Sequence, residues 1–191
     1  MRQIKLILTL ALLATITYSC SSSNKDNNPE PDTAAQVETK VLPKASSKVK
    51  FDPFNNVEDV RQKLSAVGIG ELGEWRDDEK GGYMSVTPYY QFGDGDMPNN
   101  LAYYLESDDS SAIKNLRIVL NINNGDRKSA LLKLGDIIEK TYRALGMESD
   151  TKIINELKFG KELKSESDTY RTRTEVEKSR IETWKFVLET K

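Results

Sequence analysis

Six aromatic side chains concentrated between residues 83 and 104 are the best candidates for a binding surface. Consecutive residues of a strand point to opposite faces of a sheet, so each adjacent pair of tyrosines puts one ring on each face. The outward rings could form a platform for a sugar or a protein partner, because tyrosine suits half-wet interfaces. The alternative is ordinary sheet packing, in which aromatic residues are favoured. The six residues are Tyr83, Tyr89, Tyr90, Phe92, Tyr103 and Tyr104.

The residue types that are missing limit the chemistry open to the chain. It contains no histidine and a single cysteine, Cys20. Imidazole zinc sites, Ser-His-Asp triads and histidine general bases are therefore excluded, as are an intrachain disulfide and a cysteine-based metal cluster. Any catalysis would have to use carboxylates, lysines, tyrosines or hydroxyl groups.

Carboxylates occur in short clusters that predict loops and turns. Asp94 and Asp96 flank Gly95, and such oxygen ligands suit Ca²⁺, but their spacing does not match an EF-hand. A glycosidase needs two carboxylates facing each other about 5–10 Å apart, whereas neighbouring acids at a turn tip point outwards. We therefore expect solvated turns, no metal and no cofactor. The turn acids are Asp77, Asp78, Glu79, Asp108 and Asp109.

Basic residues near the C-terminus alternate with acidic ones. Arg171, Arg173, Lys178 and Arg180 could meet an anionic polymer or lipid headgroup, but glutamates interleave with them. Cross-strand ion pairs on a solvated face are the expected outcome. The net charge of −2 is far from the basic footprint of a nucleic-acid-binding protein, so we expect no nucleic-acid partner.

The elements that must position these side chains follow from hydrophobic periodicity. Pro88 lies inside one strand run and predicts an edge strand or a bulge there. The clearest strand is 113–123, in which Leu116, Ile118, Leu120 and Ile122 alternate with mostly polar residues. Helices are predicted over 57–67, from Asp126 to Gly146 and from Asp150 to Gly160, and strands over 71–77, 83–91, 100–106, 113–123, 170–176 and 184–188.

This order of elements, α-ββββ-αα-ββ, predicts an α+β fold. Short links between consecutive strands make a sheet mainly antiparallel. Helices that are grouped, and do not alternate with strands, favour a layer on one face of the sheet. We therefore expect a mainly antiparallel sheet of about six strands with helices packed on one face.

The first residues have the pattern of a secretory signal. Arg2 and Lys5 precede a mostly apolar run over residues 6–16. A membrane-spanning helix needs about 20 apolar residues, whereas the hydrophobic region of a signal peptide needs about 7–15. The sequence therefore predicts a signal peptide over residues 1–19.

The residues after this run, Thr17-Tyr18-Ser19-Cys20, resemble the lipobox of bacterial lipoproteins. The resemblance covers only the first 20 or so residues. It implies cleavage before Cys20, a thioether-linked diacylglyceryl group on that cysteine, usually a third acyl chain such as palmitate on its amine, and a Gram-negative envelope location. The alternative is an ordinary signal peptide with an incidental cysteine.

The composition of residues 20–50 predicts a tether, and the predicted helices and strands over residues 51–191 indicate a single α+β domain. The tether is rich in Ser, Asn, Asp and Pro and poor in aliphatic residues, which is typical of disorder. The leading hypothesis is a non-enzymatic binding or protein-interaction module, lipid-anchored to the outer membrane at its periplasmic face or at the cell surface, with an envelope protein or a glycan as partner. The alternatives are a carboxylate-based carbohydrate hydrolase and a structural part of an envelope assembly.

Overall fold

The computed structural model of the chain describes residues 48–191. The predicted signal peptide at 1–19, the predicted lipid attachment site Cys20 and residues 21–47 of the predicted tether lie outside the described residues. Contacts with the core reach back to Val49, whose backbone N–H and C=O both bond to the side-chain amide of Asn55 at 2.9 and 3.1 Å.

The described strands form one antiparallel sheet in the order β1-β2-β4-β5-β8-β7-β6, with β3 pairing on β4 as well. Both long hairpins, β4–β5 and β7–β8, are joined side by side through β5 and β8, so the sheet's centre is built from its longest strands. The strands are β1 (Arg76–Asp77), β2 (Tyr83–Val86), β3 (Tyr90–Phe92), β4 (Asn99–Ser107), β5 (Asn115–Ile122), β6 (Lys164–Glu166), β7 (Tyr170–Lys178) and β8 (Glu182–Thr190).

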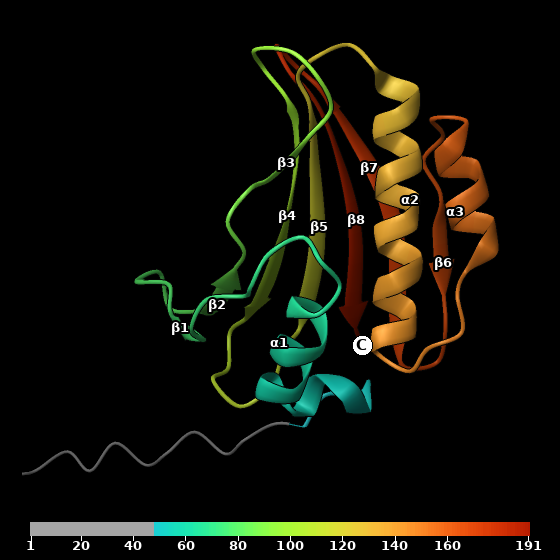
Figure 1. The fold of residues 1–191 in the computed structure, drawn as a ribbon. Helices are drawn as coiled ribbons and strands as arrows, with labels where there is room; N and C mark the ends of the chain where they lie inside the picture. The colour runs from blue at the N-terminus through green and yellow to red at the C-terminus, as the bar shows by residue number, and fades with distance from the viewer. Residues whose placement is uncertain (1–47) are drawn as a thin grey trace, which may run out of the picture. The chain divides into compact units, whose positions relative to one another are not determined.

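The helices lie on one face of this sheet (Figure 1). They are α1 (Val57–Ser65), α2 (Arg127–Ala144) and α3 (Thr151–Lys158), preceded by a 3₁₀ turn, η1 (Asp52–Asn55). Each α-helix begins at a side-chain cap: Asn56 accepts from the N–H of Asp59, Asp126 from Ser129, and Asp150 from Lys152 and Ile153. Such caps satisfy the unpaired donors of the first turn.

The predicted α+β class and the antiparallel sheet with helices on one face are confirmed, but the predicted strand count of about six is wrong. The run predicted over 83–91 is two strands, because Pro88 cannot continue the ladder. Thr87 bridges the break: its hydroxyl accepts from the N–H of Tyr103 at 3.0 Å. The strand β6 contains only Lys-Ser-Glu, so hydrophobic alternation could not indicate it.

The core lies between the helix layer and alternate residues of the central strands. Leu101, Tyr103 and Leu105 of β4 stand opposite Leu120, Ile118 and Leu116 of β5, which in turn stand opposite Trp184, Phe186 and Leu188 of β8. All nine are buried, and α2 covers them with a stripe that includes Leu134, Ile138 and Tyr142. Burying each such side chain contributes about 1.5–3 kcal/mol.

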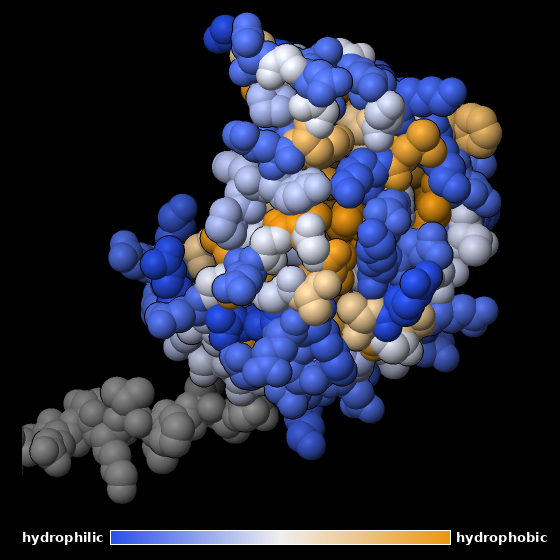
Figure 2. Space-filling model, in the orientation of Figure 1, coloured by the Kyte–Doolittle hydropathy of each residue, from blue (hydrophilic) through white to orange (hydrophobic). Residues whose placement is uncertain are grey.

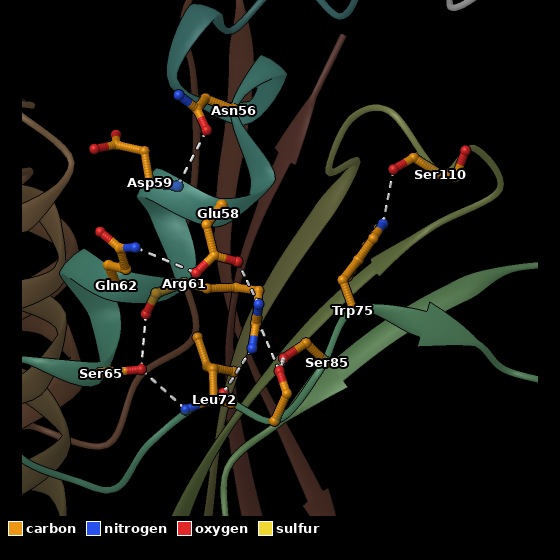
Figure 3. A network of polar contacts seen from close by, with 11 residues as sticks. Asn56, Glu58, Asp59, Arg61, Gln62, Ser65, Leu72, Trp75, Ser85 and Ser110 are labelled. Atoms are coloured by element: carbon orange, nitrogen blue, oxygen red, sulfur yellow. Dashed lines mark hydrogen bonds and ion pairs between the residues drawn. The ribbon is translucent and has the colours of Figure 1, made fainter.

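A polar network ties the segment after α1 to the edge of the sheet (Figure 3). The guanidinium of Arg61 donates to the carbonyls of Gly73 and Leu72 at 2.8 and 3.1 Å. The hydroxyl of Ser65 accepts from the N–H of Leu72 at 2.9 Å, and Ser85 of β2 donates to the carbonyl of Gly73 at 2.6 Å. The segment therefore lies along the end of β2 that β1 does not cover, where the N–H of Gly73 donates to the carbonyl of Val86 at 3.0 Å. Backbone groups at this edge would otherwise be left unpaired.

Candidate functional site

The face of the sheet that points away from the helices is the candidate functional surface, and it is called the open face below. No α-helix of the described part of the chain packs against it (Figure 1). Strand alternation places on it the residues that lie between the core positions. Its central part comprises Met84, Val86 and Gln91 of β2 and β3, Asn100, Ala102, Tyr104 and Glu106 of β4, Arg117, Val119 and Asn121 of β5, and Thr183, Lys185, Val187 and Glu189 of β8.

Two tyrosines meet on this face. The hydroxyls of Tyr89 and Tyr104 lie 3.3 Å apart, and Tyr89 is 58% exposed. Arg117 stands opposite Tyr104 in the register, with its guanidinium carbon 5.5 Å from the centre of that ring. Arg117 also forms an ion pair with Glu106. One ring of each tyrosine pair therefore lies on the open face, and these two rings are brought together.

Tyr104 stays neutral over a wide pH range. Partial burial raises the pKa of its phenol to about 12, and the hydrogen bond and proximity of Tyr89 add to the effect. The Arg117 guanidinium acts in the opposite direction but does not outweigh burial. At neutral pH the Tyr104 hydroxyl can thus act as a hydrogen-bond donor and acceptor.

A row of neutral polar side chains crosses four strands beside this pair. Gln91 stands opposite Asn100, Asn100 opposite Asn121, and Asn121 opposite Thr183. The amide of Asn121 donates to the carbonyl oxygen of the Asn100 side chain at 2.9 Å, and the Thr183 hydroxyl donates to Asn121 at 2.8 Å. This set of four residues is called the amide row below.

The amide row retains free hydrogen-bonding groups. Within the described residues, the side-chain nitrogen of Asn100 and both polar atoms of Gln91 have no protein hydrogen-bond partner. Gln91 is exposed and Asn100 is half-buried, so both are within reach of a ligand. Ala102 is the open-face residue of β4 between Asn100 and Tyr104. Because its side chain is buried under its neighbours in the described part of the chain, no solvent-accessible pocket reaches it between the amide row and the tyrosines.

The remaining predicted aromatic residues lie elsewhere. Tyr103 is fully buried under α2, where its hydroxyl pairs with Thr141 at 2.6 Å, and burial raises its pKa. Tyr90 and Phe92 stack at 6.2 Å on the helix-facing side, and Tyr83 stacks on Trp75 at 6.1 Å. The six aromatic residues therefore do not form one surface; only Tyr89 and Tyr104 meet on the open face.

The acidic residues singled out in the sequence lie in loops and turns, except Asp77, which was predicted in a turn but is the last residue of β1. In the part of the chain that the structure describes, no group of three or more His, Cys, Asp or Glu side chains is placed to hold a metal ion. Asp94 and Asp96 are exposed in the loop after β3. Asp78 accepts from the N–H groups of Gly82 and Lys80, and these bonds lower the pKa of its carboxyl. Asp78 therefore closes the turn between β1 and β2.

In the predicted basic stripe, Arg171 and Arg173 pair with acids of their own and neighbouring strands. Arg171 pairs with Glu166 on β6 at 3.1 Å. Arg173 pairs with Glu189 on β8 at 3.1 Å and with Glu175 on its own strand. These are the cross-strand pairs that the alternation of charges predicts, so this end of the open face presents compensated charges.

The helix-bearing side has a different surface. Figure 2 shows hydrophilic side chains over most of it, with hydrophobic ones reaching the surface in the middle of the view, beside α2, and near the upper parts of α2 and α3. The exposed apolar side chains there include Leu132 on α2 and Phe159 at the end of α3. A hollow of about 420 Å³ between α1 and α2 is lined by Lys63, Lys140 and Arg143, each already paired with an acid of its own helix.

The amide row was not recognised in the sequence. Asn121 belongs to the polar side of a clearly alternating strand, but only the register between strands shows that it stands between Asn100 and Thr183. A single sequence carries no signal for that register when the links are irregular loops.

No protein-family model, curated protein or solved structure matches the chain. Among the described residues, no helix is both long enough and apolar enough to cross a membrane.

Proposed function

We propose that the chain is a bacterial envelope lipoprotein, anchored through lipid on Cys20, whose α+β part is a non-enzymatic binding module. The open face of the sheet is its ligand surface. The single observation that carries this assignment is the exposed Tyr89, hydrogen-bonded to Tyr104 beside an amide row with unpaired polar groups.

The anchor is supported by the leader alone. A basic start, a short apolar run and Ser19-Cys20 resemble a lipoprotein signal. Two or more acyl chains hold a protein stably on a bilayer, whereas one chain binds only marginally. In this proposal the residues between Cys20 and the described domain connect it to the outer membrane, at the periplasmic face or at the cell surface.

The anchor is tested by replacing the cysteine. The Cys20→Ala protein should lose incorporation of a labelled palmitate and move from the membrane fraction to the soluble fraction of lysed cells. A Ser21→Ala protein serves as the control and should stay with the membranes. Recovery of the Cys20→Ala protein in the membrane fraction would contradict lipid anchoring.

The binding surface is tested by chemical crosslinking and pull-down from intact cells. Wild type and Phe159→Ala should recover the same crosslinked material, whereas Tyr89→Ala should recover much less. Phe159 is a matched control because it is an exposed aromatic side chain in the helix layer. Equal recovery with all three proteins would show that the open face is not the ligand surface.

A further inference from the structure

The charges of the central part of the open face argue against an ionic ligand there. The cations of this part already have acidic partners: Arg117 pairs with Glu106, and Lys185 with Glu177 at 3.1 Å. An anionic polymer would have to displace these carboxylates from Arg117 and Lys185. A cationic polymer would have to displace the guanidinium and ammonium groups from the two glutamates. A charged ligand would replace an ion pair within the protein by an ion pair with itself. Because surface ion pairs are individually weak, it would gain little affinity from this replacement.

The uncharged part of the face has a composition suited to hydroxyl groups. The amide row offers both donors and acceptors, because amides carry an NH₂ group and a carbonyl oxygen. Its four side chains cross three inter-strand gaps, a width of about 14 Å. Two internal hydrogen bonds hold three of these side chains, Asn100, Asn121 and Thr183, in place, so ordering them on binding costs less side-chain entropy than it would for free side chains.

Tyr89 adds an apolar ring next to these polar groups. With 58% of its surface exposed and its hydroxyl held by Tyr104, the ring is fixed at one end and open to a ligand. A ring of this kind can pack against the C–H face of a sugar while the amides bond to its hydroxyls. The surface is shallow, because Ala102 is covered and leaves no pit for a single sugar to enter.

From these features we infer that the open face binds a neutral polysaccharide, which lies across the amide row and packs on Tyr89. The inference rests on the proposed function and specifies its ligand class. A shallow, rigid surface with a wide polar row suits an extended polymer, which contacts several groups at once, better than a monosaccharide.

The test is affinity electrophoresis of the purified protein in gels containing a soluble β-glucan, xylan, galactomannan or α-mannan, with polygalacturonate as the charged comparison. At least one neutral polymer should retard the wild type. Tyr89→Ala and Gln91→Ala should each weaken that retardation about tenfold, as expected from loss of one stacking or hydrogen-bonding contact. Both side chains are exposed, so these variants should fold, and circular dichroism checks that they do.

Phe159→Ala should bind the polymer as the wild type does, and free monosaccharides should not compete. The inference is overturned if no neutral polymer retards the wild type, if polygalacturonate alone does so, or if binding survives both open-face substitutions. If the recovery of crosslinked material from cells still falls in Tyr89→Ala while no neutral polymer retards the wild type, the inferred polysaccharide ligand is contradicted, but the proposed binding module is not. If neither depends on Tyr89, both proposals fail.

Discussion

The phenol of Tyr104 shows how its neighbours control one side chain of the open face. Partial burial and the Tyr89 hydroxyl both disfavour the phenolate, and together they raise the pKa of Tyr104 to about 12. The result is a tyrosine that keeps its proton at any physiological pH and can donate it in a hydrogen bond to a ligand.

An alkaline titration followed by tyrosinate absorbance tests this environment. The wild type should contain a tyrosine that ionises near pH 12, and Tyr104→Phe should lack it. A titration in which Tyr104→Phe removes a group ionising near pH 10 would contradict the assignment.

The same shift has a consequence for stability. The pKa of the Tyr104 phenol is about 12 in the folded state, whereas an unperturbed tyrosine, as in the unfolded state, has a pKa of about 10. The resulting contribution to the free energy of unfolding is fully present below pH 10 and is lost as the pH rises towards 12. Burial also raises the pKa values of Tyr103 and Tyr142. The free energy of unfolding should therefore fall steeply above pH 10, and Tyr104→Phe should reduce that fall.

At the scale of elements, the segment between α1 and β2 depends on Arg61. Its side chain bonds to two backbone carbonyls that would otherwise lack these donors at the sheet edge. Hydrogen bonds to charged groups contribute about 1.5–3 kcal/mol. Arg61→Ala should therefore lower the free energy of unfolding by about 2 kcal/mol, measured by urea denaturation.

Lys63→Ala is the matched control for that experiment. Lys63 lies on the same helix, but its ion pair with Asp59 is exposed at both ends. Exposed pairs of this kind contribute about 0.3–0.5 kcal/mol. If the two substitutions cost the same, the Arg61 network does not hold the segment.

The elements also show what the sequence could predict. The long strands and all three α-helices were predictable because their apolar residues keep a regular period and capping residues precede the helices. The break at Pro88 was indicated only as an edge or a bulge, and the three-residue β6 has no apolar residue to reveal it. One outward ring was predicted for each tyrosine pair, but not which one. The contact between Tyr89 and Tyr104 depends on the register offset that the Thr87–Pro88 break introduces.

For the whole molecule, the sheet separates two chemically different sides. One carries the helices and the core, with exposed Leu132 and Phe159 on its outer surface. The other is a polar face with compensated charges, two tyrosines and the amide row. We propose that the open face is the side through which the domain, tethered through Cys20, meets its ligand.

Site-specific photocrosslinking in intact cells tests this claim most directly. A benzophenone amino acid is placed at Gln91 on the open face or at Leu132 on α2, both exposed positions. After irradiation, position 91 should yield a shifted, crosslinked species, with a polysaccharide or a protein attached, and position 132 should not. Crosslinking from position 132 alone, or from neither position, would contradict a ligand surface on the open face.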